Sequence, residues 1–179
     1  MRSTRETARN FGSLMVFAMI AAAEALGQES DSPEPRRRIV VSIPARKLAL
    51  MEHGRIVKLY DVAVGAPESP TPSGTFTIVE RVKNPAWYGP DKVVGPGKDN
   101  PVGPRWLGLS RKGYGIHGTN NPRSIGKRAS HGCVRMRNRD VEDLFERVSK
   151  GDTVELRNER GEELAEIFGG TAIAAGGGQ

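Results

Sequence analysis

The sequence contains a single cysteine, Cys133, in the run Ser130-His131-Gly132-Cys133-Val134-Arg135-Met136. A second histidine, His117, lies 16 positions upstream of it and is followed by Gly118 and Thr119. A thiolate is the attacking form of cysteine, and a neighbouring imidazole is the usual base that generates it. One thiol with two nearby histidines therefore indicates nucleophilic cysteine catalysis.

The two motifs can also supply the other groups that such catalysis needs. His131 would share the face of Cys133 if the segment were a strand. The carbonyl of Gly118 could orient the imidazole of His117 by accepting its other N–H, as a carboxylate does in other triads. A tight turn at Gly132 would expose the N–H groups of Gly132 and Cys133 as oxyanion donors. A buried core cysteine beside accidental histidines is the alternative.

The elements around these motifs predict a mainly β domain, a sandwich or mixed sheet, with one or two short helices. Alternating apolar residues predict strands near 39–43, 48–51, 56–64, 75–79, 106–110, 114–117 and 153–156. Val141, Leu144 and Phe145 fall at helical spacing and predict a helix over 139–149 that Asn138 caps. Asn121 and Pro122 can begin a short helical turn, and His53 falls in a turn.

A long stretch between the strands has no periodicity. Residues 83–105 are rich in Gly, Pro, Asn and Asp and include Trp87 and Tyr88. A segment of that length is either a functional lid or a mobile loop. We expect it to cover the site, and a solvated insertion is the alternative.

The ends of the chain have different compositions. Residues 1–27 combine a basic start with an apolar stretch too short for a comfortable span, which predicts a secretory signal peptide. An uncleaved anchor or a buried helix is the alternative. Residues 28–37 read as a linker, 38–158 as the catalytic domain and 159–179 as a largely disordered extension.

Export bears on both the charge and the cysteine. Removing the signal takes away three basic and two acidic side chains, so the formal charge falls from +6 to +5. Nucleic acid is then not an expected partner, and the surplus fits an anionic extracellular polymer or simply a soluble surface. Secreted domains use cysteines in pairs, so a lone thiol in an oxidising compartment is buried, paired with another chain, or used.

The strings Tyr114-Gly115-Ile116-His117-Gly118-Thr119 and Ser130-His131-Gly132-Cys133-Val134-Arg135-Met136 resemble the catalytic signature of the L,D-transpeptidase family, the YkuD-type domain. The resemblance extends to Val64-Gly65, to Thr71-Pro72-Ser73-Gly74-Thr75-Phe76 and to Gly151-Asp152-Thr153-Val154. It covers about residues 38–157.

The resemblance implies acyl transfer on peptidoglycan stem peptides. Cys133 would attack the carbonyl of the third, diamino-acid residue of a tetrapeptide stem, D-alanine would leave, and an amine would resolve the thioester into a 3–3 cross-link. His117 would be the base and Gly118 would orient it. His131 and Gly132 would shape the oxyanion pocket, and Arg135 would hold substrate or site geometry. Ser130, Thr119 and Tyr114 would belong to the same oxyanion and substrate-binding set, with Ser130 in a structural role.

The resemblance implies no cofactor, no metal and an exported protein of the periplasm or cell envelope. Four other functions stay open. Water as acceptor would make a carboxypeptidase or endopeptidase, and a lipoprotein lysine would make an anchoring enzyme. His117, His131 and Cys133 could instead hold a catalytic zinc with water in the fourth position. A wall-binding module without activity could also keep the fold.

Overall fold

A computed structural model describes residues 37–169 of the chain. The predicted signal peptide, nearly all of the predicted linker and residues 170–179 lie outside the described residues. Within residues 37–169, no helix has the length and apolar character needed to cross a membrane.

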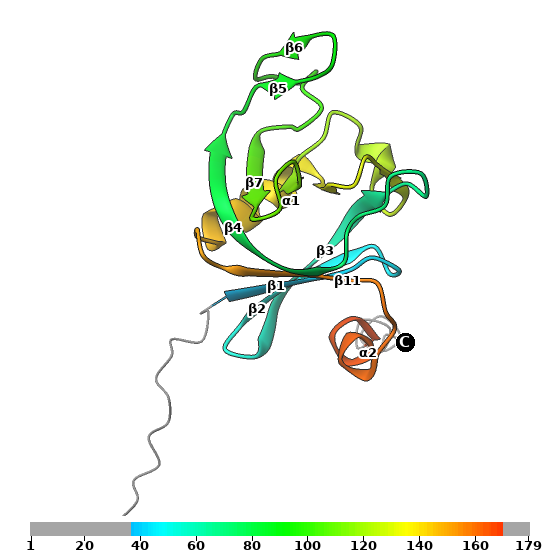
Figure 1. Ribbon diagram of the computed structural model, residues 1–179. Coiled ribbons are helices and arrows are strands. Elements are labelled where there is room, and N and C mark those ends of the chain that lie inside the picture. Colours follow the sequence, from blue (N-terminus) through cyan, green and yellow to red (C-terminus); the bar gives the residue numbers. More distant parts are fainter. Residues whose placement is uncertain (1–36, 170–179) are drawn as a thin grey trace, which may run out of the picture. The chain divides into compact units, whose positions relative to one another are not determined.

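The described chain is mainly β, as the sequence predicts. Its strands are β1 (Arg37–Ser42), β2 (Lys47–Glu52), β3 (Arg55–Gly65), β4 (Gly74–Lys83), β5 (Trp87–Tyr88), β6 (Val93–Val94), β7 (Arg105–Leu109), β8 (Gly115–His117), β9 (Arg128–Ser130), β10 (Val134–Met136) and β11 (Thr153–Arg157). Two α-helices, α1 (Asn138–Arg147) and α2 (Glu162–Gly169), and the short 3-10 helix η1 (Pro122–Ser124) complete it. The predicted fold class is confirmed (Figure 1).

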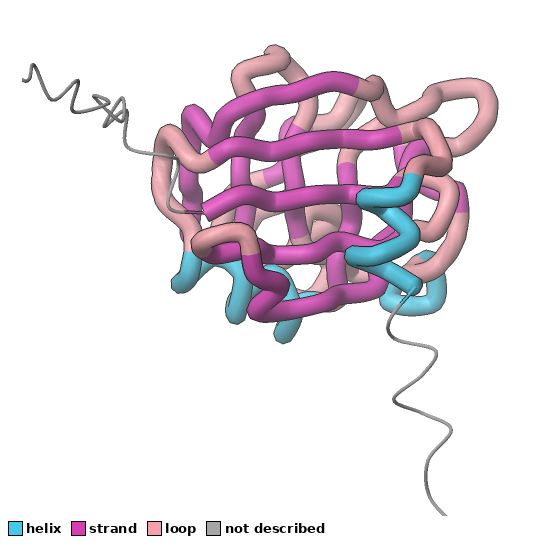
Figure 2. Tube along the Cα trace, turned by 90° about the horizontal axis from the view of Figure 1, so that it is seen from below, coloured by secondary structure: helices cyan, strands magenta, loops and turns pink. Residues whose placement is uncertain are grey.

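The main sheet is mixed and closes on itself. Its strands follow the order β10-β8-β7-β4-β11-β1-β2-β3-β9, and β10 also pairs with β3. The extra pairing joins the two ends of an eight-strand ring, with β9 added beside β3. Figure 2 shows strands side by side across the molecule, with further strands crossing behind them. Closure satisfies backbone groups that an open edge would leave exposed. Three pairings are parallel: β1 with β11, β8 with β10 and β3 with β9.

The helix α1 covers one side of this sheet with the apolar face that the sequence predicts. Val141, Leu144 and Phe145 are buried in the main core with side chains from the strands. The helix runs from Asn138 to Arg147, and Arg137 occupies its N-cap position without a side-chain hydrogen bond. The prediction that Asn138 caps the helix was therefore wrong.

The second helix, α2, covers the outer face of β1 and β2. Leu164 and Ile167 of α2 form a separate apolar cluster with Val40, Ala49 and Met51. This explains why β1 and β2 carry buried apolar residues on both faces. Order in residues 159–179 therefore reaches further than predicted, because 162–169 are helical and packed.

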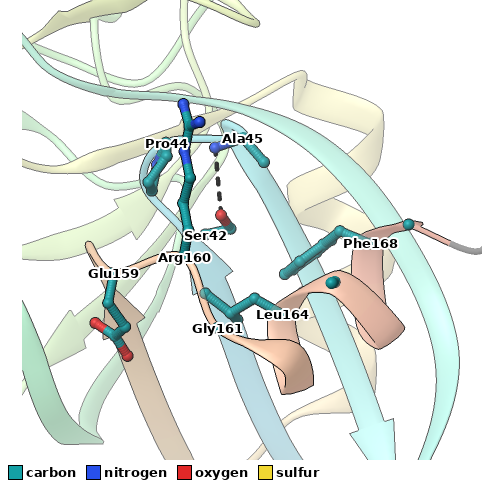
Figure 3. A pocket seen from close by; sticks show the side chains of 10 residues that line it. Ser42, Pro44, Ala45, Glu159, Arg160, Gly161, Leu164 and Phe168 are labelled. Atoms are coloured by element: carbon teal, nitrogen blue, oxygen red, sulfur yellow. Dashed lines mark hydrogen bonds between the residues drawn. The ribbon is translucent and has the colours of Figure 1, made fainter.

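A hollow of about 320 Å³ lies beside α2 (Figure 3). It is lined by Ser42, Pro44, Ala45, Glu159, Arg160, Gly161, Leu164, Ala165, Phe168 and Gly169. None of these residues belongs to the motifs around His117 and Cys133. The hollow is thus a feature of the α2 packing and not of the predicted site.

The long segment between β4 and β7 is an ordered structure built on a short hairpin. β5 and β6 pair within it and project beyond the main sheet (Figure 1). Asn100 is almost fully buried and donates to the carbonyls of Pro85 and Gly95. Its own side-chain oxygen accepts the N–H of Val102. One buried amide thus holds both arms of the segment together.

The packing of α2 predicts a measurable contribution to stability. Ile167→Ala should lower the free energy of unfolding by about 2–4 kcal/mol, because it leaves a cavity in the outer apolar cluster. Urea unfolding followed by circular dichroism measures it. Glu166→Ala, at an exposed position of the same helix, should change it by less than about 0.5 kcal/mol. Equal effects of the two substitutions would contradict the packing of α2 on β1 and β2.

Candidate active site

Strand register places three side chains of the site in one row. His117 of β8 lies opposite Trp106 of β7 on one side and opposite Arg135 of β10 on the other. Residues in register on neighbouring strands point to the same face of a sheet. Cys133 immediately precedes β10, two residues before Arg135, and so approaches the same face.

These residues line one cavity of about 400 Å³. The lining consists of Trp87, Tyr88, Pro101, Val102, Trp106, Gly113, His117, Ser130, His131, Cys133 and Arg135. The two sequence motifs therefore meet in space, although 16 positions separate their histidine and cysteine. Trp87, Tyr88, Pro101 and Val102 of the long segment form another wall of the cavity.

The imidazole of His117 is buried and fixed by the neighbouring backbone. Its Nδ1 lies 2.6 Å from the carbonyl oxygen of Gly118. Since a carbonyl only accepts, Nδ1 carries the proton and Nε2 is left as the basic nitrogen. Burial lowers the pKa of His117 to about 4; the hydrogen bond to Gly118 opposes this shift and the charge of Arg135 adds to it. The ring is therefore neutral at neutral pH.

The thiol of Cys133 is also held in its neutral form. Burial raises the pKa of Cys133, while a backbone hydrogen bond at Gly115 and the charge of Arg135 act in the opposite direction. Its Sγ lies 3.7 Å from the carbonyl oxygen of Gly113. No hydrogen bond joins Cys133 to His117 among the described residues. The resting site therefore holds a neutral thiol and a neutral imidazole. The thiolate, which is the attacking form of cysteine, is not the resting form of Cys133.

The turn that carries Cys133 is organised by the hydroxyl of Ser130. Ser130 Oγ donates to the carbonyl of Cys133 at 2.5 Å and accepts the N–H of Gly132 at 3.1 Å. Gly132 has φ of +109°, and an added Cβ there would lie 2.7 Å from the ring of Tyr114. The prediction that the N–H of Gly132 is an oxyanion donor is not supported, because that N–H is engaged by Ser130. The N–H of Cys133 is the remaining candidate of the predicted pair.

Two predicted contact residues, Thr119 and Tyr114, do not line the cavity. Thr119 is buried, and its Oγ1 accepts the N–H of Asn121. The ring of Tyr114 packs against Gly132 and lies 5.1 Å from the guanidinium of Arg111. These positions brace the two motifs. His131, in contrast, is exposed at the cavity rim.

Sequence reasoning missed Asn138 as a residue that positions the first motif. Its Oδ1 accepts the N–H of Thr119 at 2.8 Å. A Cβ added at Gly118 would lie 2.5 Å from that oxygen, and one added at Gly103 would lie 2.6 Å from it. Both glycines are needed for this close approach. An asparagine at a helix start is typical of a cap, which hid its long-range role.

The upstream motif supports the second one. Thr71 is buried, and its hydroxyl accepts the N–H of Gly65 at 2.8 Å. Ser69 Oγ donates to the carbonyl of Ser130, which also accepts the N–H of Ala66. The segment around Thr71 thus holds the start of the turn that carries Cys133.

The stretch of sequence that carries both motifs has a surplus of positive charge. From Asn100 to Arg139 the sequence has nine lysines and arginines and no aspartate or glutamate. Six of these cations form no ion pair with a carboxylate of residues 37–169: Arg111, Lys112, Arg123, Lys127, Arg128 and Arg135. Arg135 lines the cavity, and its Nε is buried without a hydrogen-bond partner in the described chain. An anionic ligand would be attracted to this surface.

The structure does not gather the ligands of the zinc alternative into a metal site. Across residues 37–169, no group of three His, Cys, Asp or Glu side chains is arranged to hold a metal ion. His117 Nδ1 is hydrogen-bonded to a carbonyl, and His131 is exposed.

Known proteins resemble this chain in both sequence and structure. Residues 36–156 match the family described as L,D-transpeptidase catalytic domain, YkuD. A putative L,D-transpeptidase YkuD of Bacillus licheniformis is 47% identical over 119 residues, which is 66% of this chain and 64% of that protein. A putative L,D-transpeptidase YqjB of Bacillus subtilis is 35% identical over 157 residues, with 84% of this chain and 88% of that protein covered.

Solved structures share the fold at low sequence identity. An L,D-transpeptidase solved in complex with imipenem is 19% identical, with a TM-score of 0.59 over 68% of this chain and 59% of the other. Both motifs and the cavity between them lie within the matched region, 36–156, as does the closed sheet apart from Arg157 at the end of β11. The chain belongs to the L,D-transpeptidase family with a YkuD-type catalytic domain.

Proposed function

We propose that this protein is a cysteine-dependent L,D-transpeptidase that acts on peptidoglycan stem peptides. One observation carries the proposal: Cys133 and His117 line the same cavity, and the bond from Nδ1 to the Gly118 carbonyl leaves Nε2 unprotonated. A nucleophile, a base and a group that orients the base are the parts that covalent acyl transfer needs.

In the first half-reaction, Sγ of Cys133 attacks the carbonyl carbon of the diamino-acid residue of a tetrapeptide stem. The thiol proton passes to Nε2 of His117 as the S–C bond forms, because both groups are neutral at rest. The N–H of Cys133 would donate to the oxyanion. As the intermediate collapses, the bond to the terminal D-alanine breaks, His117 returns its proton to the leaving amine, and a thioester remains.

In the second half-reaction, an amine of a neighbouring stem attacks the thioester. His117 accepts the proton of that amine, the C–S bond breaks, and Cys133 recovers its thiol. The product is a 3–3 cross-link. Water as the acceptor would give carboxypeptidase or endopeptidase activity, and a lipoprotein lysine would give anchoring of that lipoprotein.

The charge of the site supports a stem peptide as the substrate. Stem peptides carry several carboxylates, and the guanidinium of Arg135 lines the cavity without a carboxylate partner in the described chain. A partly buried guanidinium gains most from such a partner, because a carboxylate can accept two parallel hydrogen bonds from it. We infer that Arg135 holds a carboxylate of the donor stem. A substrate in the wall also implies export to the periplasm or envelope.

We expect Cys133→Ala to abolish turnover, with a loss of about 10³-fold or more, because no other thiol can form the acyl-enzyme. Mass spectrometry of defined tetrapeptide stems incubated with the protein measures it and identifies the acceptor. Dimers mean transpeptidation, and tripeptides mean hydrolysis. Imipenem, found in the complex of a structural neighbour, should add its mass to the wild-type protein and not to the variant.

A thermal melt of Cys133→Ala should match the wild type, which separates lost chemistry from lost folding. Turnover that survives in the folded variant would end the catalytic proposal and favour a wall-binding module. Turnover that a strong chelator removes would favour the zinc alternative.

The pH dependence follows from the buried imidazole. His117 loses its role as base only when Nε2 is protonated, so kcat/KM should fall as pH drops through about 4 and not through 6.5. The raised pKa of Cys133 should also keep iodoacetamide labelling slow at neutral pH. His53→Ala, at an exposed turn, is the control and should leave both profiles unchanged. A midpoint near 6.5 would show that the imidazole is solvated.

The hairpin beside the site should act in substrate capture. Tyr88 is 77% exposed and lines the cavity, so Tyr88→Ala should raise KM about five- to tenfold with little change in kcat. Iodoacetamide labelling of Cys133 should stay the same. Val57→Ala, an exposed apolar position on β3, serves as the matched control. Unchanged KM in Tyr88→Ala and in a protein with a shortened 89–92 tip would assign the hairpin no part in binding.

A further inference from the structure

We propose that Glu80 is a positioning residue of the active site, which holds the indole of Trp106 against the imidazole of His117. Glu80 lies in neither motif and is far from both in sequence. The inference rests on the proposed role of His117 as the base. Three features of the sheet carry it: a bulge, a pair of glycines and a stacked ring pair.

A β-bulge turns Glu80 toward the site. Ile78 pairs with Leu109 across β4 and β7, but the next pair is Glu80 with Gly108, so Val79 is an extra residue. Without it, Val79 would face Gly108 and Glu80 would take the face of the buried core. Bulges are often found beside active sites, where they redirect a side chain. Here the extra residue places Glu80 on the face that carries Trp106 and His117.

Two glycines make a floor for the indole of Trp106. Gly108 and Gly115 pair across β7 and β8, two residues along each strand from the pair formed by Trp106 and His117. A Cβ added at Gly115 would lie 2.6 Å from the Trp106 ring, and one added at Gly108 would lie 3.0 Å from its Nε1. A larger residue at either position would crowd the Trp106 ring. The two glycines therefore leave the space that the indole occupies.

The indole is fixed at both ends. Its Nε1–H donates to Oε2 of Glu80 at 2.9 Å. Its ring stacks on the imidazole of His117, with centroids 5.6 Å apart and planes at 27°. Gly118 holds one edge of the imidazole through Nδ1, while Trp106 limits tilting of the ring. Because small misplacements of a base slow proton transfer strongly, Glu80 would contribute to the rate without contacting the substrate.

The test is a double-mutant cycle on acyl transfer to stem peptides. Glu80→Ala should lower kcat about tenfold with little change in KM, and Trp106→Phe, which removes the N–H, should have a similar effect. In the Trp106→Phe background, Glu80→Ala should cost nothing further, because its partner atom is gone. Glu80→Gln should recover most of the lost rate, since an amide oxygen also accepts the N–H. Glu162→Ala, an exposed carboxylate on α2, is the control.

A direct role of Glu80 in binding the cationic acceptor amine would give a different pattern. Glu80→Ala would then raise the KM for the acceptor, Glu80→Gln would match it, and the loss would persist in Trp106→Phe. Any of these results, or full activity in Glu80→Ala, would overturn the proposal.

Nuclear magnetic resonance of the ¹⁵N-labelled imidazole gives a readout that does not need turnover. In Glu80→Ala the pKa of His117 should rise above its wild-type value, because an indole that is no longer held admits water to the imidazole. Arg135, on the other side of the imidazole, stays in place. A shifted titration in a protein without transpeptidase activity would support the positioning role and refute only the proposed function. An unchanged titration would refute the positioning role itself.

Discussion

The register between β7, β8 and β10 is the constraint on which the site depends. It sets Trp106, His117 and Arg135 side by side and brings Cys133 to the start of the last strand. The same register buries the imidazole between an indole and a guanidinium, and burial is the main cause of its low pKa. A slip of one residue in β8 would send His117 into the core and Ile116 into the cavity.

Contacts from other parts of the fold fix the positions of β7, β8 and β10. The closed sheet leaves β10 paired on both sides, with β8 and with β3. Asn138 joins the start of α1 to the backbone after β8, and Thr71 supports the approach to the turn at Cys133 through Gly65. These contacts come from segments far apart in sequence, so the site is a product of the whole sheet and not of the two motifs alone.

The sequence points to those parts of the candidate site that are local. His117, Gly118 and Cys133 occur in short contiguous strings, and the apolar face of α1 repeats at helical spacing, so both could be found before the structure. The β-bulge at Val79 could not, because one extra residue leaves no distinct mark in a strand pattern. The engagement of the Gly132 N–H by Ser130 was also hidden, since a serine hydroxyl in a turn has several possible partners. Long-range partners such as Asn138 and Glu80 follow from sheet closure and register, which local periodicity does not encode.

The neutral, partly buried state of Cys133 has a consequence for its reaction with oxidants. Peroxide reacts with the ionised sulfur, and sulfenic acid is repaired most readily when a second thiol captures it as a disulfide. This chain has no second thiol. In the proposed mechanism the sulfur keeps its proton at rest, which shields it from damage that the molecule could not reverse by itself.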